Sequence, residues 1–335
     1  MNVLRRPEDA NAPASASGEH AAALAQLIAE GRFAPQLGVT CRGRFDGAGQ
    51  QAIAVVSAMM LARFAGCRYL HSPFVHMRHA QGTPQDWAAR WEGFFNLGEG
   101  EALVPAGAEL VPLSAAIERP DDYADRPIVV FRPLFHLPDE AGPIGERLRG
   151  ELRRKYWRSP KTAIPSHRAG CGFTAAIHLR RGDVTPTLSG HRYVRNDAML
   201  RQIARLRRAV APLGRSLTLN LYSEGDAEEF GAFADAGCNL HVSEDPFETL
   251  HNMVTADILV SAPSNFSYIA ALLSRGIVLD HRRRPPPFSN FLRRRADASI
   301  PVKQLRQALL KRVGLLDRYA HRIRRVLQRG TASAR

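Results

Sequence analysis

The stretch that decides the fold is FTAAIHLRRGD, residues 173–183, in which a short apolar run ends in a polar loop. Such a run, bounded by glycine or polar residues, predicts a buried strand of a parallel sheet. Similar runs follow it along the chain: LTLNLYS (217–223), NLHVS (239–243), DILVSA (257–262) and IVLD (277–280). Helical patterns separate the runs, near 196–210, 226–236, 246–255 and 265–275. Strands that alternate with helices predict βαβ units around a parallel sheet.

The N-terminal half begins with the same pattern. Strands are predicted at LGVTC (37–41), CRYLH (67–71) and PIVVF (127–131), with a helix at 50–66 after the glycine-rich turn RGRFDGAG (42–49). Residues 155–170 carry prolines and glycines with little periodicity, which indicates a linker between two α/β halves. We therefore expect a disordered leader at 1–20, an N-terminal α/β domain at 21–160, a C-terminal Rossmann-like domain at 161–300 and a basic helical tail at 301–335.

The net charge of +14 is concentrated at one end of the chain. Residues 281–335 hold 16 Lys and Arg against 2 Asp and Glu, and the other 280 residues hold 30 of each sign. A neutral body argues against a nucleic-acid-binding protein. No stretch approaches the roughly 18 apolar residues of a membrane span, and the N-terminus lacks the hydrophobic core of a signal peptide. These features predict a cytoplasmic protein.

The tail has a pattern of its own. From Val302 to Leu327, apolar residues recur near a helical period, with arginines between them, which predicts an amphipathic helix. Its apolar face could pack on the body of the protein. In the alternative interpretation, residues 302–328 make peripheral contact with anionic lipid at an inner membrane.

Aromatic and histidine residues of the N-terminal half allow two interpretations each. The segment DWAARWEGFF (86–95) places four aromatic residues on one helical face: Trp87, Trp91, Phe94 and Phe95. The stripe is interpreted as core, with a sugar-stacking platform as the alternative. His71 and His136, at predicted strand ends, either line an acceptor site or are structural.

Three polar segments of the C-terminal half begin where predicted strands end: HLRRGD (178–183), YSEGD (222–226) and SAPSNFS (261–267). In an open parallel sheet, ligands bind beyond the carboxyl ends of the strands. Side chains alternate along an extended segment, so only one of Arg180 and Arg181 is expected to face a cleft between the two halves. A guanidinium group donates in pairs to phosphate oxygens. The alternative is that both form surface salt bridges, for example with Asp183.

The third segment adds a helix N-terminus. Ser264 is predicted as the N-cap, which would leave the backbone N–H groups of residues 265–267 as an anion site. An arginine and a helix N-terminus at neighbouring strand ends suit a diphosphate, and no cluster of metal ligands accompanies them in the sequence. Glu224 and Asp226 could accept hydrogen bonds from guanine or ribose, or could be solvated loop acids.

These segments together resemble the motifs of the GDP-fucose-dependent fucosyltransferases. This superfamily includes bacterial α1,2-fucosyltransferases, α1,6-fucosyltransferases and protein O-fucosyltransferases. HLRRGD is similar to their H-x-R-R-x-D motif, LYSEGD to their second motif, and DILVSAPSNFSYIAALL to their third. GRFDGAGQQAIAVVSAMMLARFAG is similar to their N-terminal G-x-x-G-N-Q loop and helix. The matches follow the family's order over residues 43–280.

The resemblance implies roles for individual residues. Arg180 would hold the β-phosphate, His178 would lie against the nucleotide, and Asp183 would brace the arginine loop. Glu224, with Asp226 beside it, would lie at the guanine or ribose. Residues of the turn and of the glycine loop would complete the donor site: Ser264, Asn265, Phe266, Ser267, Gly49 and Gln50.

The resemblance also implies an activity: inverting, metal-independent transfer of fucose from GDP-fucose to a glycan hydroxyl by a two-domain GT-B enzyme. The acceptor would be a surface polysaccharide or an oligosaccharide, and no cofactor beyond the donor is implied. Leu188 stands where the α1,6 branch has its catalytic glutamate, so Asp46 is the first candidate for the base and His191 the second.

Two alternatives stay open. The glycine in SEGD separates acids that are adjacent in the family, which leaves another GDP-hexose possible as donor. The sequence pI of about 10.4 leaves a non-catalytic binder of nucleic acid or of an anionic surface as the less favoured reading.

Overall fold

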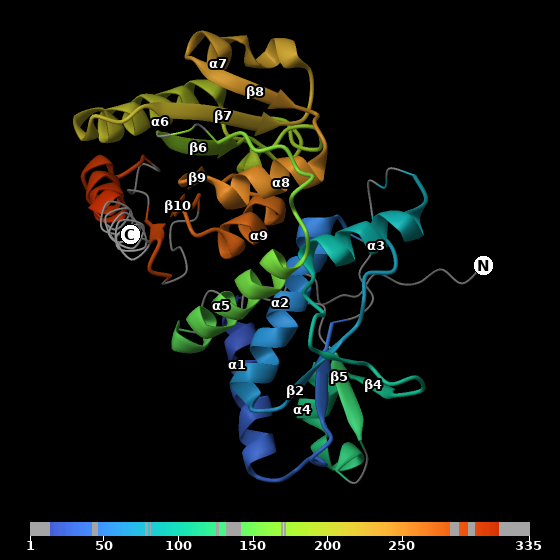
Figure 1. The fold of residues 1–335 in the computed structure, drawn as a ribbon. Coiled ribbons are helices and arrows are strands. Elements are labelled where there is room, and N and C mark those ends of the chain that lie inside the picture. The colour runs from blue at the N-terminus through green and yellow to red at the C-terminus, as the bar shows by residue number, and fades with distance from the viewer. Residues whose placement is uncertain are drawn as a thin grey trace, which may run out of the picture. The chain divides into compact units, whose positions relative to one another are not determined.

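The computed structural model shows an α/β protein with two parallel sheets (Figure 1). It describes residues 14–41, 46–77, 80, 82–124, 127–131, 142–168, 170, 172–281, 288–293 and 299–314. The chain forms two compact units. Unit 1 comprises Met1–Pro165, Ser264–Leu273 and Pro286–Ser289; unit 2 comprises Ser166–Pro263, Ser274–Pro285 and Asn290–Arg335. The prediction of an α/β fold with parallel sheets is confirmed.

Unit 1 is built on a five-stranded sheet of order β3-β2-β1-β5-β4. Its strands are β1 (Gly38–Thr40), β2 (Arg68–His71), β3 (Ala102–Leu103), β4 (Glu109–Pro112) and β5 (Ile128–Phe131). Its α-helices are α1 (Ala14–Ala29), α2 (Ala48–Ala65), α3 (Pro84–Phe95), α4 (Leu113–Glu118), α5 (Gly142–Arg158) and α9 (Asn265–Leu273). The short helix η2 covers Pro120–Tyr123. Helix α2 is buried along most of its length, which makes it the central helix of this unit.

Unit 2 is built on a six-stranded sheet of order β11-β10-β9-β6-β7-β8. Its strands are β6 (Phe173–His178), β7 (Leu217–Ser223), β8 (Cys238–Val242), β9 (Ile258–Val260), β10 (Ile277–Leu279) and β11 (Phe291–Leu292). Its helices are α6 (Asn196–Val210), α7 (Gly231–Asp235), α8 (Pro246–Thr255), the short η4 (Gly190–Arg192), η5 (Ala211–Leu213) and η6 (Ala227–Phe230), and helical residues 302–314. The strands of this sheet pair in parallel, and Ile177, Leu221 and Val260 lie in its fully buried core.

Most predicted elements of both halves are present, and the differences lie at element ends. Helix α1 begins at Ala14, within the segment predicted as a disordered leader, because alanine and leucine favour a helix there. Helix α5 runs to Arg158, into the predicted linker 155–170. Strands β3 and β11 have two residues each, too few to show a period in the sequence.

The aromatic stripe of α3 is core, as predicted. Trp87, Trp91, Phe94 and Phe95 are at most 8% exposed. Trp91 stacks on Phe95 with ring centroids 5.2 Å apart and meets Phe266 edge-on at 6.2 Å. Because these rings fill the interior of unit 1, the stripe offers no exposed platform for a sugar.

Helix α9 packs in unit 1, although the strands before and after it belong to unit 2. Arg149 of α5, 1% exposed, donates from Nε to the Leu272 carbonyl at 2.9 Å and from Nη2 to the Ala271 carbonyl at 3.3 Å. Arg153 donates to the Leu273 carbonyl at 3.3 Å. The last carbonyl groups of a helix have no partner within the helix, and positive charge is favourable there. Two arginines of α5 therefore cap α9.

This packing divides the predicted domain 161–300. Residues 264–273 and 286–289 belong to unit 1, whereas the prediction placed them in the C-terminal domain. The alternation of strands and helices in a sequence is a local pattern, and it does not tell on which unit a helix packs.

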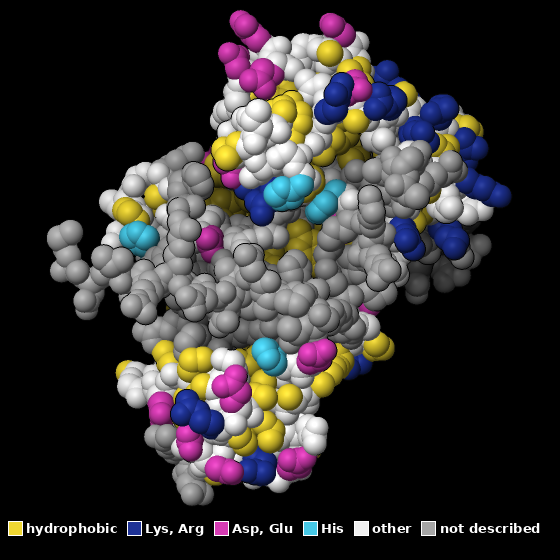
Figure 2. All heavy atoms as spheres, turned by 180° about the vertical axis from the view of Figure 1, so that it is seen from behind, with side chains coloured by type: hydrophobic (Ala, Val, Ile, Leu, Met, Phe, Trp, Pro, Cys, Tyr) yellow, Lys and Arg dark blue, Asp and Glu magenta, His cyan; other side chains and the backbone are white. Residues whose placement is uncertain are grey.

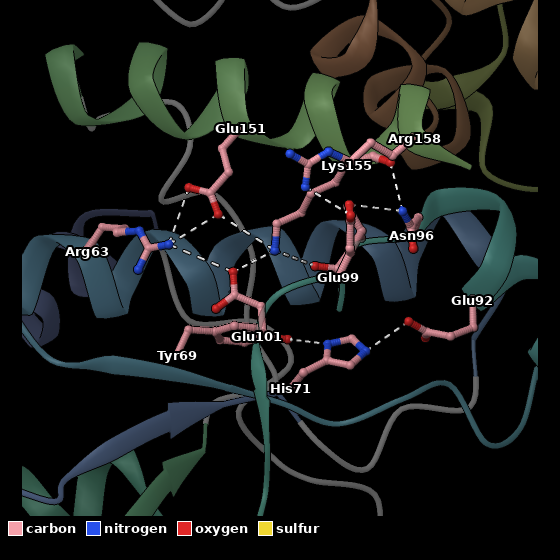
Figure 3. A network of polar contacts seen from close by, with 11 residues as sticks. Arg63, Tyr69, His71, Glu92, Asn96, Glu99, Glu101, Glu151, Lys155 and Arg158 are labelled. Atoms are coloured by element: carbon pink, nitrogen blue, oxygen red, sulfur yellow. Dashed lines mark hydrogen bonds and ion pairs between the residues drawn. The ribbon is translucent and has the colours of Figure 1, made fainter. Parts of the chain in front are cut away.

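An ion-pair network fixes α5 within unit 1 (Figure 3). Lys155, 6% exposed, donates to Glu101 at 2.6 Å and to the Leu97 carbonyl at 3.0 Å. Arg63 of α2 pairs with Glu151 of α5 at 3.2 Å. Because Lys155 is buried and Glu101 is only 11% exposed, each compensates a charge that would otherwise be poorly hydrated and unpaired.

The described part of the tail packs on unit 2. Leu305 and Leu309 are fully buried in the core of that unit. Arg306 donates to the Arg208 carbonyl at 2.8 Å, and Arg312 pairs with Asp257 at 3.2 Å. The apolar face of 302–314 is thus used in packing. Residues 315–328, the rest of the segment predicted to contact lipid, lie outside the described residues.

Exposed arginines extend the basic surface beyond the tail. Arg201, Arg207 and Arg208 of α6 are exposed. Figure 2 shows Lys and Arg side chains gathered where α6 and residues 302–314 lie. The basic surface of unit 2 therefore joins a body helix to the tail. Among the described residues, no helix has both the length and the apolar character needed to cross a membrane.

Gly49 allows α2 and α9 to approach closely, which makes it a test of this packing. A Cβ at Gly49 would lie 2.6 Å from both the nitrogen and the Cα of Phe266. Gly49→Ala should therefore destabilise the protein by about 1–3 kcal/mol. The matched control is Gly93→Ala in α3, where a Cβ meets nothing within 4 Å and should stabilise by roughly 0.5–1 kcal/mol. Thermal unfolding measures both, and shifts of the same sign would contradict the packing.

Candidate functional site

The candidate site of unit 2 lies at the carboxyl edge of its sheet, where the loops after β6 and β7 meet. His178 and Tyr222 are neighbours in the parallel register of these strands. Gly182 has φ +72°, and a Cβ on it would lie 2.5 Å from Oε2 of Glu224. A glycine is needed there for both reasons. The structure thus brings the HLRRGD and YSEGD loops into contact.

Arg180 and Asp183 form a two-pronged ion pair in the first of these loops. Nε of Arg180 donates to Oδ1 of Asp183 at 3.0 Å, and Nη2 donates to Oδ2 at 2.6 Å. The side chains are 24% and 53% exposed. Asp183 therefore holds the guanidinium plane of Arg180 while leaving it reachable from solvent. This geometry suits bidentate binding of an anion that replaces the carboxylate.

Arg181 is structural. It is 5% exposed and donates to the Val194 carbonyl at 2.8 Å and to Oδ1 of Asn196 at 2.7 Å. Its guanidinium lies 4.1 Å from the centre of the Tyr193 ring. Burial is the largest cause that lowers the pKa of Arg181, and Tyr193 and Glu229 oppose it. The two neighbouring arginines therefore differ in exposure, as alternation along an extended segment predicts.

His178 is buried at the end of β6, 8% exposed. Burial, with smaller contributions from the neighbouring Arg180 and His281, lowers its pKa to about 3. The imidazole is therefore neutral at physiological pH. A neutral ring could contact a nucleotide, but it adds no positive charge to the site.

The loops after β9 and β10 bring further polar residues to the same edge. Oγ of Ser261 donates to Oδ1 of Asp280 at 3.3 Å, and the backbone N–H of His281 donates to Oγ of Ser261 at 3.1 Å. Nδ1 of His281 lies 3.1 Å from the Asp280 carboxylate. Asp280 and His281 were not among the residues predicted from the sequence. The available signal was this polar pair directly after the apolar residues 277–279 of the predicted strand IVLD.

The remaining predicted residues of unit 2 have less specific positions. Asp226 caps η6 by accepting from the Glu228 N–H at 3.2 Å, which is a structural role. Glu224 is exposed. His191, the second candidate for the base, is exposed in η4, and Leu188 is 62% exposed.

In unit 1, the N-termini of α9 and α2 lie against each other. Ser264 caps α9, since its Oγ accepts from the Phe266 N–H at 3.2 Å. Asn265 donates to Oε1 of Gln50, and Gly49 contacts the backbone of Phe266. The structure thus joins the SAPSNFS turn to the glycine loop. One of the three N–H groups predicted to bind an anion, that of Phe266, is used by the cap.

Ser267 and Asp46 flank this contact. Ser267 is fully buried and donates to the Ser264 carbonyl at 3.2 Å. The carbonyl of Asp46 accepts from Gln51 at 2.8 Å, and Gln51 also donates to the His76 carbonyl at 2.7 Å. Gln51 therefore fixes Asp46, the first candidate for the base, next to the segment after β2.

A cavity of about 720 Å³ opens at the carboxyl edge of the unit 1 sheet. The residues that line it follow β1, β2 and β3 or belong to α2: Cys41, Gln51, Val55, residues 71–75 and residues 103–108. His71 lies in its wall, with Nδ1 3.0 Å from the Tyr69 hydroxyl and Nε2 2.8 Å from Glu92 (Figure 3). Glu92 also accepts from the Phe74 N–H at 3.0 Å. His71 thus has a structural role in shaping the cavity; His136 lies outside the described residues.

A group of metal-ligand type also occurs in unit 2, although the sequence analysis predicted none. His167, His241 and Glu244 offer donor atoms within 4.8 Å of one another. Residues 167 and 241 are far apart in the sequence, so the group forms no local motif that could have been recognised. Comparison with known proteins adds no relative: no family model matches the chain, and no curated protein has a similar sequence.

The different positions of the two arginines predict different effects on stability. Arg181→Met would leave the part-buried oxygens of Val194 and Asn196 without this donor, which should lower the free energy of unfolding by roughly 1–3 kcal/mol. Arg180→Met removes a partly exposed ion pair and should cost less than about 1 kcal/mol. Urea unfolding of both variants measures the difference. A larger loss for Arg180→Met would reverse the assignment.

The low pKa of His178 predicts an acid-sensitive stability. Unfolding exposes the ring and restores its ordinary pKa near 6.5, so below this pH the unfolded chain binds a proton that the native chain does not. Stability from this residue is complete above pH 6.5 and falls with pH toward the folded pKa. From pH 6.5 to pH 5 the free energy of unfolding should fall by roughly 1.5 kcal/mol more in the wild type than in His178→Gln. Urea titrations at both pH values test this, and parallel losses would contradict it.

Proposed function

We propose that this protein is a glycosyltransferase that moves fucose from GDP-fucose to a hydroxyl group of a glycan acceptor. The observation that carries the proposal is the loop cluster of unit 2. There, a partly exposed guanidinium group of Arg180 and the carboxylate of Glu224 stand at the carboxyl ends of adjacent parallel strands. Ligands of open parallel sheets bind at this edge.

Two further features support the proposal. The SAPSNFS turn and the glycine loop, separate in the sequence, are in contact through Gly49 and Asn265. The carboxyl edge of the unit 1 sheet holds a cavity with a largely apolar lining. In the proposed GT-B enzyme, the cluster of unit 2 binds the donor and the cavity of unit 1 binds the acceptor.

In the proposed reaction, the acceptor oxygen attacks C1 of fucose and the bond from C1 to the β-phosphate oxygen breaks. The bonding electrons leave with GDP, and the acceptor proton passes to a base. Arg180 stabilises the charge that develops on the leaving diphosphate, an effect that one well-placed donor makes worth about 3–4 kcal/mol. Protein cations alone supply this charge in the proposal, so turnover should survive EDTA.

Because the charge on the leaving diphosphate is stabilised, the acceptor hydroxyl needs at most a weak base. Asp46, held at the start of α2, remains our first candidate and His191 the second. Another GDP-hexose as donor is the alternative, because Asp226 is taken up in capping η6 and leaves Glu224 as the carboxylate for guanine or ribose.

Arg180 is the residue to test. Arg180→Ala should lower kcat/KM for GDP release from GDP-fucose about 10²–10³-fold, and Arg180→Lys should retain part of the activity because it keeps the charge but loses the planar fork. The measurement is GDP release with and without EDTA, for GDP-fucose and GDP-mannose.

The matched control is Arg195→Ala. Arg195 is an exposed arginine that, like the partly exposed Arg180, pairs with a nearby aspartate, in this case Asp197 at 3.0 Å. It should leave turnover unchanged. Full activity of Arg180→Ala would remove Arg180 from the mechanism, and preference for GDP-mannose would favour the alternative donor.

A further inference from the structure

Four side chains of metal-ligand type gather around the end of β8, the edge strand of the unit 2 sheet. The ring of His241, on β8, stacks on the ring of His167 with centroids 3.9 Å apart. Nδ1 of His241 lies 3.0 Å and 3.1 Å from the two oxygens of Glu244. Nε2 of His167 lies 2.7 Å from Oε1 of Glu248, in the first turn of α8. Each imidazole therefore has a carboxylate at one ring nitrogen.

The hydrogen bonds of Asn220 determine which nitrogen of His241 carries a proton. Nδ2 of Asn220 donates to the His167 carbonyl at 3.0 Å, so its Oδ1 is an acceptor. This oxygen accepts from Asn239 at 2.9 Å and lies 3.3 Å from Nε2 of His241. Nε2 must then be the donor. In the neutral tautomer, Nδ1 points a lone pair at the Glu244 carboxylate. Two groups that both carry lone pairs repel each other, so this arrangement needs a cation between them.

His167 can present its second nitrogen in the same way. Its Nδ1 lies 3.0 Å from the Tyr222 hydroxyl, which can accept a hydrogen bond from the ring N–H as well as donate one to the ring. When Nδ1 donates to Tyr222, Nε2 carries the lone pair, beside Glu248. Asn220 and Tyr222 both lie on β7. Asn220 is the hydrogen-bond partner of Nε2 of His241, and Tyr222 is the partner of Nδ1 of His167.

We propose that His167, His241, Glu244 and Glu248 bind one divalent transition-metal ion, with zinc as the best fit. Imidazole nitrogen and carboxylate oxygen are zinc ligands, and four of them make the tetrahedral set of a structural site. The donor atoms of His167, His241 and Glu244 already lie within 4.8 Å of one another. Two carboxylates also balance the charge of one divalent ion.

The partners on β7 support this assignment. Metal-binding histidines usually donate their other ring N–H to a nearby oxygen, which sets the tautomer and the ring orientation. Asn220 and Tyr222 are in position to accept these hydrogen bonds. The carboxylates come from one short segment, HVSEDPFE (241–248), and His167 comes from the segment before β6. A bound ion would therefore join the start of unit 2 to its edge strand.

The test uses the full-length, tag-free protein. After incubation with zinc and gel filtration, elemental analysis should find about one zinc per chain in the wild type. Cobalt should give the visible absorption of a tetrahedral complex, and zinc should displace it. His241→Ala and Glu244→Gln should lose the bound metal. The matched control for Glu244, which is 35% exposed, is Glu228→Gln on η6, and it should retain one equivalent.

Tyr222→Phe provides a milder variant that keeps the ring stack and removes one hydrogen bond. Zinc affinity should fall roughly 10–100-fold, with the thermal unfolding temperature of the metal-free chain little changed. Zinc content in the wild type no higher than in His241→Ala would overturn the proposal, and so would equal affinity in the wild type and Glu244→Gln. In either case a proton, not a metal ion, separates His241 from Glu244.

This site is independent of the proposed glycosyl transfer. Its readouts are metal content and cobalt absorption, and neither requires turnover. Loss of activity in Arg180→Ala and loss of zinc in His241→Ala therefore report on different loops of unit 2.

Discussion

The guanidinium groups of α5 cap the C-terminus of α9 and hold this helix in unit 1. Arg149 is almost fully buried, and burial is the largest cause that lowers its pKa to about 9. Such a cation is tolerated because carbonyl groups at the negative end of a helix dipole accept its hydrogen bonds. With this end held, the opposite end of α9 meets α2 at Gly49. The cap thereby places the SAPSNFS turn beside the glycine loop, within one unit.

Arg180 and Arg181 show how neighbouring residues of one type acquire different roles. Arg181 points inward, where two neutral oxygens and the Tyr193 ring fix it. Arg180 points outward and is held by Asp183. The turn at Gly182 has a positive φ and no side chain, so Glu224 can lie over it. One short loop therefore places Arg181 inward as a support, Arg180 outward as a charged group, and Gly182 where Glu224 can contact it.

The sequence predicted well what depends on local pattern. Strands β1, β2, β5 and β6 to β10 and helices α2, α6 and α8 follow from apolar periodicity, whereas β3, β4 and β11 were not predicted. The alternation of Arg180 and Arg181 follows from extended backbone. Contacts between distant segments were not predicted. The pair Asp280–His281, the stack of His167 on His241 and the place of α9 in unit 1 all depend on which segments pack together. The periodicity of apolar residues within one segment does not indicate which other segment it contacts.

In the proposed donor site, the ion pair of Arg180 and Asp183 would compensate the charge of the arginine before an anionic ligand binds. Without an acid nearby, a partly buried guanidinium would lose hydration with no compensation. Asp183 compensates it, yet a pair this exposed contributes no more than about 1 kcal/mol, so a phosphate group can displace the carboxylate at little cost. His178 beside it stays neutral, so the exchange replaces one anion by another around a single charge. In the proposed donor site, Asp183 would therefore occupy the position of the phosphate group until the donor binds.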